Sequence, residues 1–270
     1  MTANAAPGVA VRLEEHGASG LVARVTIANP GKLNIVNRAL MGELLAASGR
    51  LAVTAGLRAV VLTGEGATAF IGGADIGEMA ELDAATAKDF ITLLHRVCDG
   101  LRRLPVPVIA RIDGYALGAG LEIAASCDLR IASERAIFGM PEVRVGIPSV
   151  IEAALLPALI GWGRTRRLLL TGESISAAEA LRWGLVERIV PAAELDGAVA
   201  TMLDAILACG GNALRLQKEL ICYWEDHTIT EAVERGIGSF AAAWDSDEPR
   251  RLMRGFLDAK RRKRGGATPS

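Results

Sequence analysis

The sequence has few aromatic residues, few histidines and almost no net charge. Aromatic residues make up 4% of its 270 residues, so Ala, Leu, Val and Ile must build the core. A net charge of −1 argues against a general polyanion binder, because nucleic-acid-binding proteins usually carry a basic excess. Hydrophobic residues at 51% and charged residues at 23% exclude a disordered chain.

Metal-binding and targeting patterns are also missing. The four cysteines form no Cys-x-x-Cys pair and the three histidines are far apart, so we expect no metal site and reduced thiols. Residues 1–8 lack a basic segment followed by an apolar one, which argues against a secretory signal. The apolar runs fall short of the ~20 residues that span a bilayer. A cytoplasmic protein is the resulting expectation.

Glycine, in contrast, is abundant, with 30 residues and no repeating period. That is about 11%, against a typical usage of roughly 7%. Much of the excess falls in three segments, at 69–76, 114–122 and 138–148. Because glycine permits turns and close backbone approach, these segments are the first candidates for a site.

The first two thirds of the chain alternate strand and helix patterns. Apolar, β-branched runs predict strands at 21–27, 57–63, 107–112 and 128–132. Helix-spaced apolar residues predict helices at 37–53, 84–104 and 118–126, the second of them capped by Asp83. This alternation is typical of an α/β protein with crossover connections.

The last third is mainly helical. Helices are predicted at 177–183, 193–208, 212–224, 229–244 and 249–260, with one strand at 186–190. We therefore expect a catalytic core at 1–200 and a helical oligomerisation region at 201–270, because helices with apolar faces often pack against a partner subunit.

The second glycine segment opens a helix and offers backbone N–H groups free of bulky side chains. A helix N-terminus of this kind can bind a negatively charged oxygen through its backbone N–H groups. If the N–H of Ala74, from the first segment, points to the same place, the two donors form an oxyanion hole. The alternatives are close helix–strand packing for the second segment and a simple turn at Gly72–Gly73.

Two glutamates lie beside these segments in apolar surroundings. Glu122 is on the predicted helix, one turn after the glycines of the second segment, and Glu142 follows Pro141 in the third segment. Buried carboxylates can have separated pKa values, so that one acts as an acid and the other as a base. Taken singly, a glutamate of this kind is more often a surface or ion-paired residue.

Several stretches together resemble the enoyl-CoA hydratase/isomerase (crotonase) superfamily. They are AFIGGADIGEM (69–79), PVIARIDGYALGAGLEIAASCDLRIAS (107–133), FGMPEVRVGIP (138–148), LLLTGESISAAEALRWGLVERIVP (168–191) and WDSDEPRRLMRGFLDAKRRKR (244–264). Their order and spacing match across almost the whole chain.

The resemblance implies a spiral core of ββα turns, a helical C-terminal region that forms homotrimers or homohexamers, and an acyl-CoA substrate without a separate cofactor. It assigns Ala74 and Ala119 to the oxyanion hole and Glu122 and Glu142 to catalysis. The substrate-binding residues that it implies are Asp75, Ile76, Gly77, Gly118 and, at the CoA nucleotide, Lys260.

The implied reaction is hydration of a 2-enoyl-CoA. We expect Glu122 and Glu142 to hold the water, with Glu142 moving the proton at C2. Retention of Glu122 favours a hydratase over a double-bond isomerase, which needs one carboxylate. Acyl-CoA hydrolysis, C–C bond cleavage and a non-catalytic CoA-thioester or RNA-binding protein are further alternatives, the last opposed by the near-neutral charge.

Three positions depart from the family pattern. Ala119 replaces the middle residue of a Gly-Gly-Gly run, and Met140 stands where Gln is common. Residues 147–154 replace a glycine-rich run and add Glu152, a third acid. Glu152 is interpreted either as a carboxylate favoured by the helix dipole or as a residue of the site.

Overall fold

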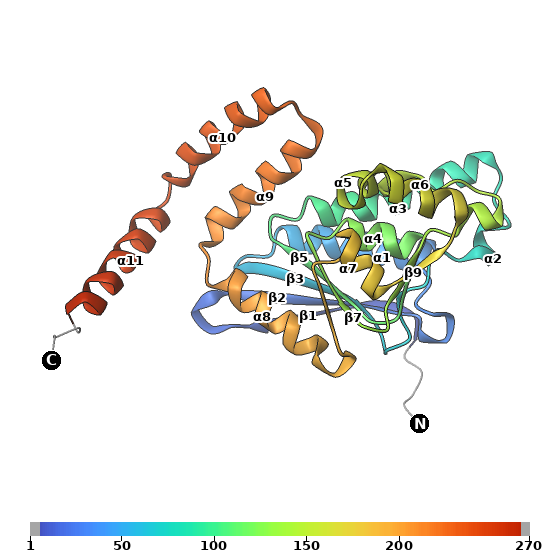
Figure 1. Cartoon of the computed structure of the whole chain (residues 1–270), viewed down its shortest axis with the longest axis horizontal. Helices are drawn as coiled ribbons and strands as arrows, with labels where there is room; N and C mark the ends of the chain where they lie inside the picture. Colours follow the sequence, from blue (N-terminus) through green and yellow to red (C-terminus); the bar gives the residue numbers. More distant parts are fainter. Residues whose placement is uncertain (1–5, 266–270) are drawn as a thin grey trace. The chain divides into compact units, whose positions relative to one another are not determined.

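The computed structural model describes residues 6–265, which divide into two compact units between Ile206 and Leu207 (Figure 1). Two sheets form the first unit. The larger has the order β1 (Gly8–Glu15), β2 (Leu21–Ala28), β3 (Leu57–Gly64), β5 (Val108–Ile112), β7 (Leu129–Ser133) and β10 (Arg188–Val190). The smaller contains β4 (Ala69–Ile71), β6 (Tyr115–Leu117), β8 (Ile137–Gly139) and β9 (Ser174–Ser176).

Three successive segments of the chain each contribute one strand to both sheets. The strands β3, β5 and β7 of the large sheet are each followed directly by β4, β6 and β8 of the small sheet. Pairing is parallel among β2, β3, β5, β7 and β10 and among β4, β6 and β8; only β1 and β9 pair antiparallel. The central strands are buried almost throughout, as expected for parallel strands covered on both faces.

Helices pack around the two sheets of this unit. They are α1 (Arg38–Ala52), α2 (Ile76–Met79), α3 (Ala84–Arg102), α4 (Ala119–Ala125), α5 (Leu156–Ile160), α6 (Trp162–Thr171), α7 (Ala177–Trp183) and α8 (Leu195–Leu207). In Figure 1, α1, α3 and α4 lie on one side of the sheet and α8 on the other. An ion pair between Arg111 of β5 and Asp196 of α8, with an N–O distance of 2.6 Å, joins these layers.

Local capping explains where the two long helices begin. The Asn37 side chain accepts a hydrogen bond from the Leu40 N–H at the start of α1. Asp83 and Thr86 form a reciprocal capping box at the start of α3. The predicted cap at Asp83 and the predicted helices in these two regions are therefore confirmed.

The second unit consists of α9 (Gly211–Asp226), α10 (Ile229–Ala243) and α11 (Glu248–Gly265). A capping box of Thr228 and Glu231 starts α10, and Glu248 accepts hydrogen bonds from the backbone N–H groups of Asn212 and Ala213. Within the described residues, no single helix is long and apolar enough to cross a membrane, although the helices at 192–207 and 211–226 reach that length and composition as a pair.

Several strands of the structure are not predicted from the sequence. No strand is predicted at β1, and the regions of β4, β6 and β8 are predicted only as glycine-rich segments. The strands β4, β6, β8 and β9 have three residues each, too few for an alternating pattern to appear.

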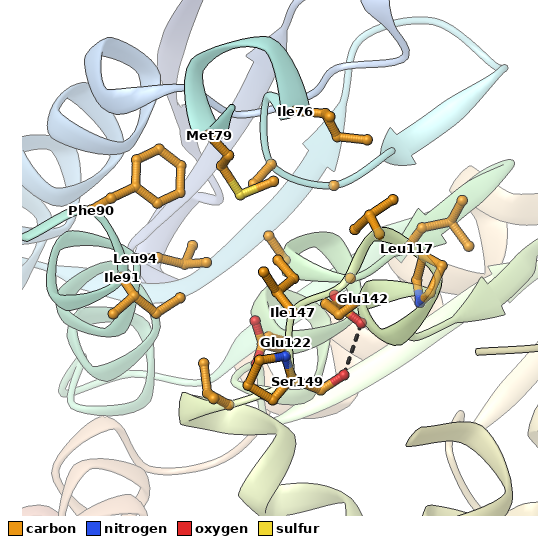
Figure 2. A pocket seen from close by; sticks show the side chains of 18 of the residues that line it. Ile76, Met79, Phe90, Ile91, Leu94, Leu117, Glu122, Glu142, Ile147 and Ser149 are labelled. Carbon is orange, nitrogen blue, oxygen red and sulfur yellow. Dashed lines mark hydrogen bonds between the residues drawn. The ribbon is translucent and has the colours of Figure 1, made fainter. Parts of the chain in front are cut away.

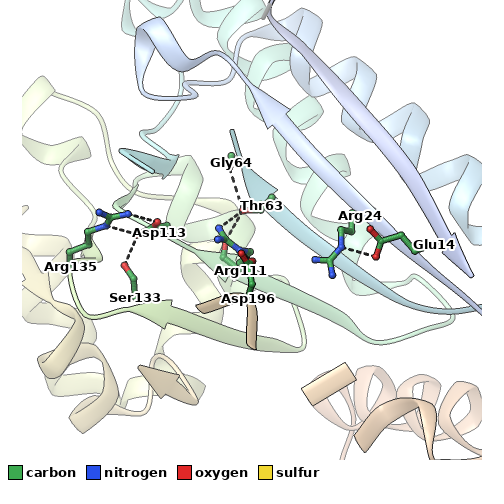
Figure 3. Close-up of polar contacts among 9 residues, drawn as sticks. All are labelled: Glu14, Arg24, Thr63, Gly64, Arg111, Asp113, Ser133, Arg135 and Asp196. Carbon is green, nitrogen blue, oxygen red and sulfur yellow. Dashed lines mark hydrogen bonds and ion pairs between the residues drawn. The ribbon is translucent and has the colours of Figure 1, made fainter. Parts of the chain in front are cut away.

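Asp113 anchors the connection between β5 and β6, which leads into the second glycine segment (Figure 3). Its carboxylate accepts hydrogen bonds from Arg135 Nη2 at 2.6 Å, Arg135 Nε at 2.8 Å and Ser133 Oγ at 2.7 Å. Burial alone would raise the pKa of Asp113, but the hydrogen bonds from Arg135 and Ser133 outweigh it and lower the pKa below its ordinary value.

We expect Asp113→Asn to lower the free energy of unfolding by about 1–3 kcal/mol at neutral pH, because charged hydrogen bonds are lost. A depressed native pKa stabilises the fold above the unfolded pKa of about 3.9, and this is lost as the pH falls through the native pKa. Urea unfolding near neutral pH and near pH ~3 should show the difference from wild type shrinking in acid.

The matched control is Glu14→Gln, which removes the more exposed pair between Glu14 Oε2 and Arg24 Nε at 2.8 Å (Figure 3). This change should cost no more than about 1 kcal/mol. Equal costs for the two variants, or a difference that does not depend on pH, would contradict the role of Asp113.

Candidate active site

One pocket of the first unit collects residues from all three glycine segments (Figure 2). Its polar side chains are Glu122, Glu142 and Ser149. Its backbone-rich edge is formed by Gly72, Gly73, Ala74, Gly118 and Ala119. Its apolar lining comprises Ile76, Met79, Phe90, Ile91, Leu94, Leu117, Val145, Ile147 and Val150, with Pro141 and Pro148.

The two predicted donor residues, Ala74 and Ala119, both line this pocket. Ala74 forms a β-bridge with Val36 that uses the Gly73 carbonyl and the Asp75 N–H, so the Ala74 N–H is left over. Ala119 is the first residue of α4, where backbone N–H groups have no partner within the helix. Among residues 6–265, neither N–H donates a hydrogen bond, so both are available to a ligand oxygen.

Glycine makes the close approach of these two segments possible. A Cβ at Gly120 would overlap the Ile71 carbonyl group, which holds the start of α4 against the end of β4. Gly118 has φ of +51°, and a Cβ there would also meet Glu142 Oε1. Gly118 therefore adopts a backbone conformation that other residues rarely reach and leaves space for the carboxylate.

Glu122 is almost completely buried, with 5% of its surface exposed. Its Oε1 accepts a hydrogen bond from the Ala153 N–H at 3.1 Å. Burial, followed by the nearby charge of Glu142, raises the pKa of Glu122 to about 8; the Ala153 hydrogen bond opposes the rise and Glu152 adds to it. Burial therefore favours the protonated form of Glu122 in the free protein.

Glu142 begins the 3₁₀ helix η3 (Glu142–Val145) and is partly exposed in the pocket. Its Oε2 accepts a hydrogen bond from Ser149 Oγ at 2.8 Å, drawn as a dashed line in Figure 2. The structure thus brings together two glutamates with different environments, one buried and one more open, beside the two donors. Such a pair suits proton transfer in both directions.

The remaining predicted residues are placed differently. Ile76 and Gly118 line the pocket, whereas Asp75 and Gly77 do not. Asp75 caps α2 by accepting from the N–H groups of Gly77 and Glu78, at 2.9 and 3.3 Å. Lys260 lies on α11 in the second unit and is exposed; its CoA contact remains a prediction.

Sequence reasoning missed Ser149 and the apolar wall from α3. In the wall, Phe90 and Leu94 are 2% exposed and Ile91 is partly buried. Helix-spaced apolar residues predicted a buried face, but the pattern cannot distinguish a pocket wall from ordinary core. The departure of residues 147–154 from the family pattern was the one feature of the sequence that pointed to the region of Ser149.

The described residues contain no group of three or more His, Cys, Asp or Glu side chains placed to hold a metal ion.

The Cys98 thiol of α3 is buried near the two glutamates Glu122 and Glu152. Burial, together with the charges of Glu152 and Glu122, raises the pKa of this thiol well above its ordinary value.

We expect Gly120→Ala to destabilise the protein by about 1–3 kcal/mol or more, because its Cβ would push α4 away from β4. Thermal unfolding measures this loss. The control is Gly42→Ala within α1, where a Cβ has no atom within 4 Å and should stabilise the helix by about 0.5–1 kcal/mol. Similar melting temperatures for both variants would be inconsistent with the close approach.

Glu122→Gln should make stability less sensitive to alkaline pH. Because the native pKa of about 8 lies above the unfolded value, the contribution of Glu122 is complete below about pH 4.3 and is lost as the pH rises through 8. Melting temperatures at about pH 5 and about pH 9 should therefore diverge in favour of the variant. Parallel pH profiles would show that the Glu122 pKa is not raised.

Comparison with known sequences supports the same family over nearly the whole chain. The family model for enoyl-CoA hydratase/isomerase matches residues 17–263. A short-chain-enoyl-CoA hydratase of Clostridium acetobutylicum is 36% identical over 243 residues, covering 90% of this chain and 93% of that protein. A crotonyl-CoA hydratase of Syntrophomonas wolfei is 34% identical, covering 87% and 91% of the two chains.

Solved structures confirm the predicted fold class. The crystal structure of an enoyl-CoA hydratase from Mycobacterium smegmatis matches with a TM-score of 0.87 and 30% identity, covering 92% of this chain and 96% of that one. That of an enoyl-CoA hydratase from Bacillus anthracis gives a TM-score of 0.86 at 29% identity with the same coverage. The chain therefore belongs to the enoyl-CoA hydratase/isomerase family.

Proposed function

We propose that this protein is an enoyl-CoA hydratase that adds water across the 2,3-double bond of a 2-enoyl-CoA thioester. The observation that carries the proposal is the pair of glutamates, Glu122 and Glu142, in one pocket with two unengaged backbone donors. The similarity to proteins named short-chain-enoyl-CoA hydratase and crotonyl-CoA hydratase supports it.

The backbone N–H groups of Ala74 and Ala119 bind the thioester oxygen in this proposal. Attack at C3 places negative charge on that oxygen as an enolate develops. Removing one such preorganised donor typically raises the barrier by ~3–4 kcal/mol. The donors are held in place before substrate arrives, since α4 is packed closely on β4 at Gly120.

The two glutamates hold the water and transfer its protons. Hydration requires a group that accepts a proton from water and a group that gives one to C2. A pair that carries one proton supplies both and ends with the same number of protons, because the proton that the base takes from water replaces the one that the acid gives to C2. The raised pKa of Glu122, about 8, favours that proton on Glu122 in the unliganded protein, so a transfer to C2 by Glu142 requires the proton to pass to Glu142 when substrate and water bind. The assignment of the C2 transfer to Glu142 remains a prediction.

The acyl chain of the substrate lies against the apolar wall of Phe90, Ile91 and Leu94. Lys260 of the neighbouring subunit contacts the CoA nucleotide.

The protein assembles as a homotrimer or a dimer of trimers in the cytoplasm. Exposed apolar residues on the second unit, including Ile237, Phe240 and Phe256, support contact with further copies. Light scattering coupled to size exclusion measures the assembly; a monomer would contradict it.

The central test follows the loss of enoyl-thioester absorbance with crotonyl-CoA. Glu122→Gln and Glu142→Gln should each lower kcat by roughly 10²–10⁴-fold, because each removes a proton-transfer group. Glu14→Gln, a charge change on β1 outside the pocket, should leave the rate unchanged. Full activity in both site variants would exclude the two-glutamate mechanism.

Double-bond isomerisation is the second candidate, favoured by one observation. Glu122 is buried and its pKa is raised, which leaves Glu142 as the open carboxylate of the pocket, and an isomerase needs only one. Formation of a 2-enoyl-CoA from a 3-enoyl-CoA, without hydration of crotonyl-CoA, would establish this alternative.

A further inference from the structure

A second buried carboxylate, Glu152, lies behind the pocket rather than in its lining. It belongs to the 3₁₀ helix η4 (Ile151–Leu155) and has 4% of its surface exposed. Glu152 Oε1 is 2.8 Å from His95 Nδ1 of α3, and the His95 ring is half exposed. The other oxygen, Oε2, is buried without a hydrogen-bond partner among the described residues. Burying a carboxylate is costly unless it is paired and hydrogen-bonded, and only one of the two Glu152 oxygens has a partner among the described residues.

The backbone beside Glu152 is connected directly to Glu122. Ala153, the next residue in η4, donates its N–H to Glu122 Oε1 at 3.1 Å. Ile151, the residue before, has φ of +40°, which is unfavourable for a β-branched side chain. Such strain persists only where the surroundings hold the backbone in place. The His95–Glu152 contact on one side and the Ala153–Glu122 hydrogen bond on the other provide that hold.

We propose that Glu152, anchored by His95, is a positioning residue for Glu122, which fixes the backbone N–H that binds the Glu122 carboxyl group. The effect on turnover rests on the proposed hydratase function, whereas the effect on Glu122 itself does not. Glu122 lines the pocket, whereas His95 and Glu152 do not. The two residues therefore act on the pocket only through Glu122.

The charge of Glu152 and the hydrogen bond that it positions act on the Glu122 pKa in opposite directions, because the charge raises that pKa and the Ala153 N–H lowers it. The titratable groups that face Glu122 are Glu142 from η3, Glu152 from η4 and the Cys98 thiol from α3. Burial keeps the Cys98 thiol neutral by raising its pKa, so the two carboxylates are the charges that matter. The negative charge of Glu152 favours the protonated form of Glu122.

The direct test is a ¹³C NMR titration of the Glu122 carboxyl carbon, assigned by its disappearance in Glu122→Gln. In Glu152→Gln the midpoint should fall by on the order of half a pH unit, since one neighbouring negative charge is removed. Glu14→Gln removes a charge of the same type on β1 and should leave the midpoint unchanged. Glu152→Ala also loses the contact with His95 that holds the Ala153 N–H, so its midpoint should lie above that of Glu152→Gln, and equal midpoints in the two folded variants overturn the proposal.

A pair of His95 variants separates positioning from general stability. His95→Asn keeps an amide N–H near the position of Nδ1, whereas His95→Ala removes the donor. His95→Ala should lower kcat with crotonyl-CoA by about tenfold with little change in KM, and His95→Asn should restore most of it. Equal rates in the two variants would overturn the inference.

The two readouts also distinguish this inference from the proposed function. If the wild type does not hydrate crotonyl-CoA, the proposed function fails, but the Glu122 titration still decides the role of Glu152. If Glu152→Gln does not fold by circular dichroism, the titration is carried out on the His95 pair. A midpoint displaced in His95→Ala and restored in His95→Asn supports the proposal, and one unchanged in both overturns it.

Discussion

The first unit depends on backbone packed directly against backbone at a few glycines. A Cβ at Gly64 would overlap the Phe70 carbonyl, one at Gly114 the Thr68 carbonyl, and one at Gly120 the Ile71 carbonyl. The strands of the small sheet can therefore follow those of the large sheet after very short connections. Since each contact leaves no room for a methyl group, the sheets and α4 are held in one arrangement.

That arrangement places two donors and three carboxylates in a small region. The N–H groups of Ala74 and Ala119 come from loops that close packing brings together. Glu122 and Glu152 are buried among apolar residues, where a charged carboxylate is unfavourable. The consequence is a raised pKa of Glu122 and a shared dependence on the short segment η4, which supplies both Glu152 and the Ala153 N–H. Rigidity at the glycines is thus what allows an electrostatically costly site to persist.

Sequence patterns were sufficient for the long elements of the fold. The runs at 57–63 and 108–112 are apolar and β-branched over a full strand length, and they form β3 and β5. The caps at Asn37 and Asp83 lie next to the helices they start, so local hydrogen bonding determines these boundaries. The strands β4, β6 and β8 have three residues each and form because a neighbouring strand pairs with them, which no local pattern records.

The amino-acid sequence by itself determined the α/β class and the glycine segments, and it pointed to Glu122 and Glu142 as isolated acids in apolar surroundings, while the family resemblance singled out Ala74 and Ala119. Only the tertiary structure decided that these four share one pocket, that Asp75 caps a helix, and that Ser149 and the α3 wall complete the lining. It also decided that Glu152 meets His95, 57 positions earlier in the chain. The physical reason is that burial, pKa and hydrogen-bond partners are set by segments distant in sequence, and folding alone brings those segments together.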